Sequence, residues 1–248
     1  MLTRQTVVKV VLLTLMLASA SARADFLGVY VGAGYWNQGM SGDAIGDVSI
    51  QDELRFSDSS GLQAYVRFEH PVPLLPNVRV ARSEIEDSSV GLLTGPVSFQ
   101  GVTFTSGQTV NTSIDMTHTD VTLYYELVDI GIDLDVGITG RIMDGQLAMG
   151  GAIEQTNTVL PLVYVAGKVG LPFSGLYVAG DVNGLGFGNA KIADFAVKLG
   201  WETDSFFLPE FGVELGYRRF VIDASASDID FVVDMDVDGL FLNLTGHF

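Results

Sequence analysis

The chain has 248 residues, with 30 Asp or Glu against 13 Lys or Arg, and it contains no cysteine. The formal net charge of −17 argues against nucleic-acid binding, which rests on cationic contacts to phosphate. A chain without cysteine forms no disulfide, thiolate metal site or cysteine nucleophile. The mean hydropathy is +0.34, yet no apolar run reaches the roughly 20 residues that a transmembrane helix needs.

The N-terminus has the pattern of a secretory signal peptide. Arg4 and Lys9 supply positive charge, residues 10–18 are apolar, and Ala24 completes a small-x-small cleavage motif. The apolar run is too short for a membrane anchor. We therefore expect cleavage after residue 24, with the mature chain beginning at Asp25. Removal of three basic residues makes the formal charge of that chain −20.

The C-terminal ten residues alternate between an apolar and a mostly polar face. Leu240, Leu242, Leu244 and Phe248 share the apolar face, and the chain ends on that aromatic residue. A strand of this length crosses a hydrocarbon core, which takes roughly 9–11 tilted residues. The ending resembles the C-terminal signal of Gram-negative outer-membrane β-barrels, which the barrel-assembly machinery reads. Gly246 departs from that pattern, which has a bulky residue there.

Period-two alternation predicts ten strands in residues 25–248, interpreted as one domain. An even number fits a closed antiparallel barrel with both termini in the periplasm. The strands are expected at about 26–36, 62–70, 77–86, 114–127, 130–141, 158–171, 176–183, 194–202, 211–218 and 239–248. Tight turns are expected in the periplasm at 71–76, 128–129, 172–174 and 204–208, and longer polar loops outside at 37–60, 87–113, 143–157 and 223–234, with a short outer connection at 184–190.

Two local features qualify this strand pattern. Residues 97–104 alternate between apolar and polar side chains. In one interpretation of the loop 87–113, they extend the neighbouring strands outward. Either register of the third strand leaves Arg79 or Arg82 facing outward.

Aromatic residues near the strand ends suggest interfacial girdles. A soluble barrel or sandwich would show the same period, with its apolar residues pointing inward. The signal peptide, terminal aromatic, loop asymmetry and girdles together favour the membrane barrel. The expected girdle residues are Phe68, Tyr125, Trp201, Phe211 and Phe248 at the periplasmic level, and Tyr35, Trp36 and Phe220 at the outer level.

Three stretches carry a resemblance to a known family. Residues 28–36 (GVYVGAGYW), residues 69–79 (EHPVPLLPNVR) and the C-terminal strand resemble a small, uncharacterised family of Gram-negative outer-membrane β-barrel proteins. The resemblance covers the whole mature chain and implies fold and location. Because the family as a group has no assigned activity, it implies no functional residue.

The polar strand faces predict a charged lumen. Long cations facing carboxylates in a narrow barrel should pair, because an unpaired buried charge is costly. Ten strands is near the size at which side chains fill the interior, so we expect a plugged barrel. The alternative is a thin water-filled passage. The predicted network comprises Arg67, Glu69, Glu126, Asp133, Asp135, Arg141, Lys168, Asp181, Lys198, Glu214 and Arg218, and the same faces hold Asp194 and Glu202.

An enzyme is not favoured. Of the mature histidines, His70 and His247 are expected at the periplasmic end, away from the outer rim where barrel hydrolases work. A grouping of Ser113, His118 and Asp120 forms no nucleophile motif. A solvated or hydrogen-bonded His118 is the preferred interpretation.

No metal or phosphate site is expected either. Residues 234–239 copy the opening of a calcium loop, but Thr245 stands where the bidentate Glu belongs. The glycine-rich stretch 184–188 opens no helix, so it forms no phosphate cradle.

We therefore expect a monomeric outer-membrane barrel without a cofactor. Its predicted role is structural or is interaction at the cell surface, and its expected contacts are outer-membrane lipid, lipopolysaccharide and the barrel-assembly machinery. The alternative is a narrow channel or transporter for small solutes, and an outer-membrane hydrolase is the least favoured hypothesis.

Overall fold

The computed structural model describes residues 28–45, 47–129, 131–172, 174–187, 190–203, 209–224 and 233–248. The predicted signal peptide and its cleavage point between Ala24 and Asp25 lie outside these residues. Within them, no helix is long and apolar enough to cross a membrane.

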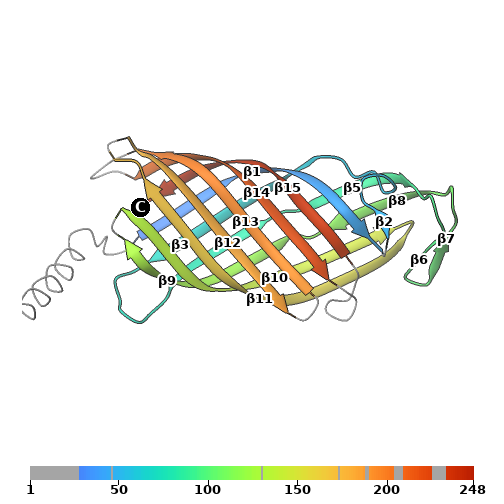
Figure 1. The fold of residues 1–248 in the computed structure, drawn as a ribbon, viewed down its shortest axis with the longest axis horizontal. Helices are drawn as coiled ribbons and strands as arrows, with labels where there is room; N and C mark the ends of the chain where they lie inside the picture. The colour runs from blue at the N-terminus through green and yellow to red at the C-terminus, as the bar shows by residue number, and fades with distance from the viewer. Residues whose placement is uncertain are drawn as a thin grey trace, which may run out of the picture.

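Ten antiparallel strands close into a barrel, in the spatial order β1-β3-β4-β9-β10-β11-β12-β13-β14-β15, and β15 pairs with β1 (Figure 1). The predicted fold class and strand number are confirmed. The strands of the wall are β1 (Gly28–Ala44), β3 (Ser59–Glu69), β4 (Asn77–Ser83), β9 (His118–Asp129), β10 (Ile132–Met149), β11 (Ala152–Gly170), β12 (Leu176–Phe187), β13 (Ala190–Glu202), β14 (Glu210–Ala224) and β15 (Val233–His247).

The two ends of the barrel differ. Phe248 and the connections from β3 to β4 and from β11 to β12 lie at one end, which in transmembrane barrels faces the periplasm (Figure 1). At the opposite, outer end, β5 (Glu86–Leu92) pairs with β8 (Thr109–Asp115) and extends the wall. Residues 97–104 form a separate small hairpin, β6 (Val97–Phe99) and β7 (Val102–Phe104), at the tip. The strand predicted at 114–127 is two strands, because Met116 and Thr117 separate β8 from β9.

The predicted loop boundaries are wrong at the outer end, because strands continue through much of the predicted loops. Residues 143–157 form the outer parts of β10 and β11, joined only by Gly150 and Gly151. Both glycines have positive φ (56° and 92°), the conformation that a tight hairpin turn requires. Similarly, β1 continues to Ala44 inside the predicted loop 37–60.

The other two outer connections are also shorter than predicted. Strand β12 continues through Phe187, so the glycine-rich stretch is mainly strand. Strand β14 ends at Ala224 and β15 begins at Val233, which shortens the predicted loop 223–234 from both sides.

Near the periplasmic end, apolar side chains point outward and polar ones inward. Leu240, Leu242 and Leu244 are all exposed on the outer surface of β15, with Phe248 after them. This outward apolar band is the surface that lipid covers in a transmembrane barrel. The five aromatic residues of the predicted periplasmic girdle, Phe68, Tyr125, Trp201, Phe211 and Phe248, are exposed on this surface.

The predicted outer girdle is only partly correct. Tyr35 is exposed, but Trp36 and Phe220 are fully buried inside the barrel. Their burial belongs to a feature that the sequence pattern did not predict. At the outer end the polarity of the two strand faces is reversed.

Strand β14 shows the reversal within one element. Glu214 faces inward in the membrane half, and three and four inward-facing positions further along the strand lie the buried Phe220 and Ile222. The outward face changes the other way, from Leu215 to Arg219. Period two is kept throughout, so the change reflects the surroundings of the wall rather than a change of strand geometry.

Strand β15 repeats this pattern. Met235 and Val237 are fully buried, while the intervening Asp236 accepts hydrogen bonds from Arg219 on the outer surface. Asp238 likewise accepts a hydrogen bond from the Tyr217 hydroxyl (2.6 Å). The acidic stretch that copies a calcium loop is therefore a strand whose carboxylates face outward.

The interior of the outer end is a hydrophobic core, closed in part by residues 47–58. Ile50, Leu54 and Phe56 of this segment are buried in it. The core also contains Trp36, Met40, Ile85, Leu93, Phe99, Phe104, Val110, Ile114, Met143, Leu147, Met149, Phe220, Ile222, Met235 and Val237.

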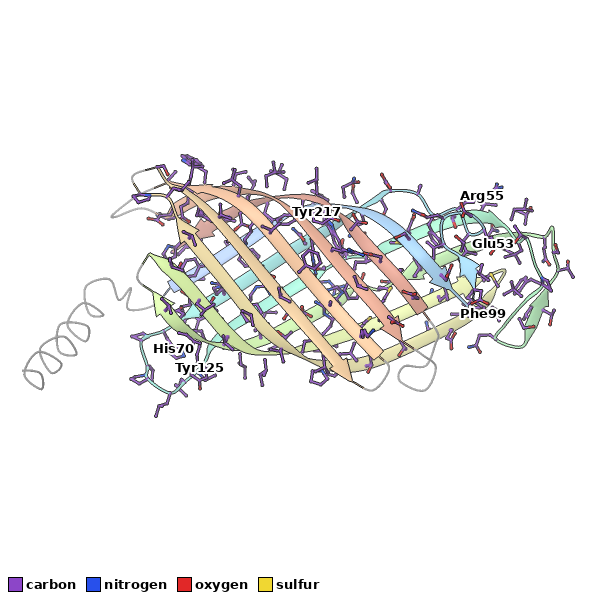
Figure 2. The ribbon with its side chains drawn as sticks, viewed as in Figure 1. Glu53, Arg55, His70, Phe99, Tyr125 and Tyr217 are labelled. Atoms are coloured by element: carbon purple, nitrogen blue, oxygen red, sulfur yellow. The ribbon has the colours of Figure 1, made fainter. Side chains whose placement is uncertain are left out.

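Glu53 fixes this segment to the wall (Figure 2). Its carboxylate accepts hydrogen bonds from the Thr94 hydroxyl (2.5 Å), the Thr94 amide (2.8 Å) and the Ser49 amide (3.2 Å). Its carbonyl accepts from the Leu92 amide (2.8 Å) at the end of β5. The Thr94 hydroxyl is the main reason that the pKa of Glu53 lies below its ordinary value. The charged form of Glu53 therefore holds the segment best.

Candidate functional site

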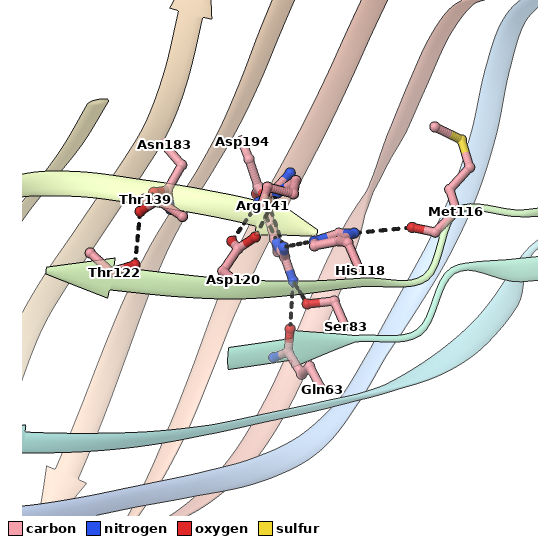
Figure 3. A network of polar contacts seen from close by, with 11 residues as sticks. Gln63, Ser83, Met116, His118, Asp120, Thr122, Thr139, Arg141, Asn183 and Asp194 are labelled. Atoms are coloured by element: carbon pink, nitrogen blue, oxygen red, sulfur yellow. Dashed lines mark hydrogen bonds and ion pairs between the residues drawn. The ribbon is translucent and has the colours of Figure 1, made fainter. Parts of the chain in front are cut away.

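A charge network in the lumen is centred on Arg141 of β10, which is fully buried. Its Nε and Nη2 atoms donate to the two oxygens of Asp120 on β9, both at 2.8 Å (Figure 3). Nη2 also donates to Asp194 Oδ2 on β13 at 2.6 Å. Since β9 adjoins β10 while β13 lies three strands from β10 in the other direction around the barrel, one guanidinium links separate parts of the wall.

Arg218 of β14 completes this layer. It donates to both oxygens of Asp194, at 2.8 and 2.7 Å, so this carboxylate is shared by two guanidiniums. Its Nη1 donates to Ser83 Oγ (2.7 Å) and Gln63 Oε1 (3.3 Å) on the far wall. The guanidinium also lies over the Trp36 ring, 4.7 Å from its centroid, where the charge layer meets the outer core.

His118 belongs to the same layer. Its Nδ1–H donates to the carbonyl oxygen of Met116 (3.0 Å), which leaves Nε2 as the acceptor facing Arg218 Nη2 (3.5 Å). Asp120 holds Arg141, and among the described residues no hydrogen bond joins Ser113 to His118. Ser113, His118 and Asp120 are therefore not joined as a hydrogen-bonded catalytic group in this structure.

A second network lies closer to the periplasmic end. Arg67 Nη1 is 3.3 Å from Glu69 Oε1 and 3.5 Å from Asp135 Oδ2, and Arg67 Nη2 donates to the Tyr164 hydroxyl (3.3 Å). Tyr124 donates to Glu69 (2.7 Å) and lies under the Arg67 guanidinium. Strands β3 and β10 thus contribute the charged groups of this cluster, and β9 and β11 contribute its tyrosines.

Two lysines form separate pairs at this level. Lys198 Nζ is 2.8 Å from Glu214 Oε1, which also accepts from the Tyr177 hydroxyl at 2.8 Å. Lys168 Nζ is 3.0 Å from Glu202 Oε1, and it lies over the Tyr177 ring.

Glycines on the lumen face make room for the tyrosine rings. A Cβ atom on Gly32 would lie 2.3 Å from Tyr65 Cε1, and one on Gly200 would lie 2.1 Å from Tyr177 Cζ. Each ring therefore packs over the backbone of a neighbouring strand. Small residues beside large ones allow ten strands to enclose so many long side chains.

A cavity of about 200 Å³ remains on the periplasmic side of the Arg141 layer. Its lining includes Arg79, which lies over the Tyr65 ring, so the structure places Arg79 inside and Arg82 outside. A smaller cavity of about 50 Å³ lies beside Arg218 and Asp194. The predicted carboxylates Glu126, Asp133 and Asp181 line the larger cavity.

Every predicted lumen residue faces the interior, and the five cations named from the sequence each have a carboxylate within 4.0 Å. The sequence did not reveal the central role of Asp120 and Asp194, nor the hydrogen-bonded series Thr122, Thr139 and Asn183 (Figure 3). The inward phase of β9, β10, β12 and β13 contained the signal, but alternation does not reveal which strands face one another.

Neither the family models nor the curated proteins include a match to this chain. Among solved structures, the crystal structure of the outer membrane protease OmpT from Escherichia coli is similar at 9% sequence identity. The superposition covers 90% of this chain and 95% of that chain, with a TM-score of 0.42. A likeness this distant carries no activity over, and the barrel assignment rests on the strand pairing itself.

Proposed function

We propose that this protein is a monomeric outer-membrane barrel of a Gram-negative bacterium with a sealed lumen and a structural or surface-interaction role. The resemblance of its terminal and turn motifs to the small outer-membrane family supports this location. The single observation that carries the proposal is the double closure of the interior. The Arg141 layer crosses the lumen, and an apolar core fills the barrel beyond it.

Both layers oppose the passage of solutes. A hydrated ion moving outward would have to displace Arg141 from Asp120 and Asp194, which leaves buried charges without partners. It would then enter a region lined by side chains such as Phe220 and Met235, which offer an ion no polar contact.

The outer end supplies a surface for interaction. Strands β5, β8, β10 and β11 project beyond the membrane half as a continuous sheet, and residues 47–58 pack against its inner side. In the described part of the chain, β12 pairs with β11 only from Val163 to Gly170, so Ala152–Leu162 has one open edge. A rigid platform of this kind suits contact with lipopolysaccharide or a partner at the cell surface.

Single-channel recording in planar bilayers tests the sealed lumen. We expect the unmutated protein to show no steady conductance. Arg218→Ala, which removes one of the two guanidiniums on Asp194, should produce a measurable leak, whereas Arg219→Ala on the outer surface should not. Steady, large conductance in the unmutated protein would contradict the proposal.

A narrow channel is the second candidate function, favoured by one observation. The cavity of about 200 Å³ carries many charged groups and lies on the periplasmic side of the Arg141 layer. A transient opening of that layer and of the apolar core beyond it would join this cavity to the outside. Small, flickering currents that respond to Arg141→Met but not to Arg219→Met would support the channel.

A hydrolase is the least favoured candidate, because His118 faces Arg218 and Met116 rather than a nucleophile. Purified protein that cleaved peptide or lipid, with loss of cleavage in His118→Ala, would establish it instead.

A further inference from the structure

The turn between β3 and β4 is unusually apolar for a loop in an acidic chain. Residues 71–76 (PVPLLP) carry no charged side chain. Leu74 is 90% exposed, Leu75 is 56% exposed and Val72 is 50% exposed. Leu74 is the most exposed large apolar side chain in the described part of the chain.

His70 holds this turn in one conformation. Its Nδ1 accepts a hydrogen bond from the Val72 amide (3.2 Å), and its Nε2–H donates to the Pro76 carbonyl (3.2 Å). The His70 amide donates to Asn77 Oδ1 (3.1 Å), which closes the base of the turn. The exposed leucines are therefore displayed on a preformed element, which lowers the entropy cost of docking.

The turn leans toward the lipid-facing side of the wall. The Tyr125 hydroxyl donates to the Leu74 carbonyl (2.9 Å), and Tyr125 shares the outward face of β9 with Leu123 and Leu127. Figure 2 shows His70 and Tyr125 beside this turn, which stands away from the barrel axis. The exposed leucines thus continue the outward apolar band.

The backbone of the turn is suited to an apolar environment. Three of its six residues are prolines, which carry no N–H donor. The Val72 amide and the carbonyls of Leu74 and Pro76 have hydrogen-bond partners within the protein. These three groups would need no water on entering a lipid interface, where each unsatisfied group is costly.

Recognition as a proline-rich ligand fits less well. Leu74 has a φ of 71°, whereas a polyproline II segment needs a φ near −75° at each residue. The turn also contains no strand that could add to a sheet.

We propose that residues 71–76 dock into the periplasmic leaflet of the outer membrane and insert Leu74 and Leu75 among the phospholipid chains. The docked turn fixes the depth of the barrel beside β3, β4 and β9. This inference goes beyond the sealed lumen and requires only that the barrel spans the membrane.

The absence of cysteine makes a direct test possible. A nitroxide is attached to Leu74→Cys, and the protein is folded into vesicles of phosphatidylethanolamine and phosphatidylglycerol. Oxygen concentrates in the bilayer and a water-soluble nickel chelate does not, so the ratio of their collision rates with the label reports its depth. Labels at Leu244→Cys on the outward band and Thr103→Cys on β7 provide the lipid and water references.

We expect the Leu74 label to give a collision ratio near that of Leu244 and several-fold above that of Thr103. A ratio equal to that of Thr103 would overturn the proposal, and would point to a periplasmic protein as the occupant instead. A second label at Leu75→Cys must agree. His70→Ala should then increase the mobility of the Leu74 label, since it removes both side-chain hydrogen bonds that hold the turn, and a heat-modifiable gel shift confirms folding of each variant.

Discussion

The membrane half and the outer half of the barrel use one wall geometry with opposite polarity. In the membrane half, Leu215 faces outward and Glu214 inward, while in the outer half Arg219 faces outward and Phe220 inward. Lipid is an apolar solvent and water a polar one, so the side-chain chemistry follows the solvent while the strand period stays at two. One continuous strand can therefore have the polarity pattern of a membrane barrel in one half and that of a water-soluble protein in the other.

The two halves also differ in what holds their interiors together. The interior of the outer half is stabilised by the burial of apolar side chains, an effect that is non-directional and tolerates small adjustments in packing. The membrane interior depends on directional hydrogen bonds between ions, in which the loss of one partner leaves another buried and unpaired. The stability of the membrane half should accordingly be more sensitive to a single interior substitution than that of the outer half.

The largest effect is expected from Arg141→Met. Asp120 loses both of its hydrogen bonds to this guanidinium, and Asp194 keeps only Arg218. We expect a loss of about 3–5 kcal/mol in the free energy of unfolding. Denaturant titration of the protein in phospholipid vesicles measures this value. Arg219→Met, which breaks the exposed pair with Asp236, is the matched control and should change stability little. Equal losses in both variants would show that burial of the network does not matter.

An intermediate effect should distinguish the two halves on one outward face. Leu215→Arg places a cation against the hydrocarbon and should cost about 2–4 kcal/mol near the bilayer midplane. Val221→Arg makes the same change further along β14, opposite Asp236, and should cost almost nothing. The same vesicle titration compares the two variants. Similar costs would show that the polarity reversal does not mark the membrane boundary.

The smallest effect concerns the attachment of residues 47–58. Because the pKa of Glu53 is below its ordinary value in the folded protein, its charge stabilises attachment above the unfolded pKa, and this contribution is lost as pH falls through the folded pKa. We expect the amide resonances of Ser49 and Thr94 to titrate together at a pH below that of an ordinary glutamate. Glu53→Gln should abolish this titration. A midpoint at the ordinary glutamate value would mean that the Thr94 hydrogen bonds are not formed in solution.

The membrane half could be predicted well from the sequence and the outer half could not. Alternation correctly separated the apolar outward face of Leu242 and Leu244 from the polar inward face of Glu214, because lipid imposes a uniform apolar exterior. Past Tyr217 of β14 the polarity of the two faces reverses, and the outer part of β10 shows the same reversal. The outer parts of β10 and β11 were therefore expected to be loop. Pattern recognition that assumes one solvent cannot identify a strand that passes into another.

The candidate site was predictable in composition but not in geometry. The inward phase identified Arg141 and Arg218 as lumen residues. That both reach Asp194 depends on barrel circumference and strand stagger, which local sequence does not encode. The docking turn was expected only as a tight connection, because its lean toward Tyr125 is a tertiary contact.

The pairing of β1 with β15 has a consequence for assembly. The first and last strands of the wall meet along most of their length, from Tyr30 with His247 to Ala44 with Val233. Until β15 arrives, β1 and β14 each present an unpaired edge, and the outer core lacks Met235 and Val237. Closure thus joins residues 189 to 217 positions apart, the kind of long-range contact that makes folding slow. An incomplete chain should therefore persist as an open sheet that needs a chaperone, rather than as a smaller barrel.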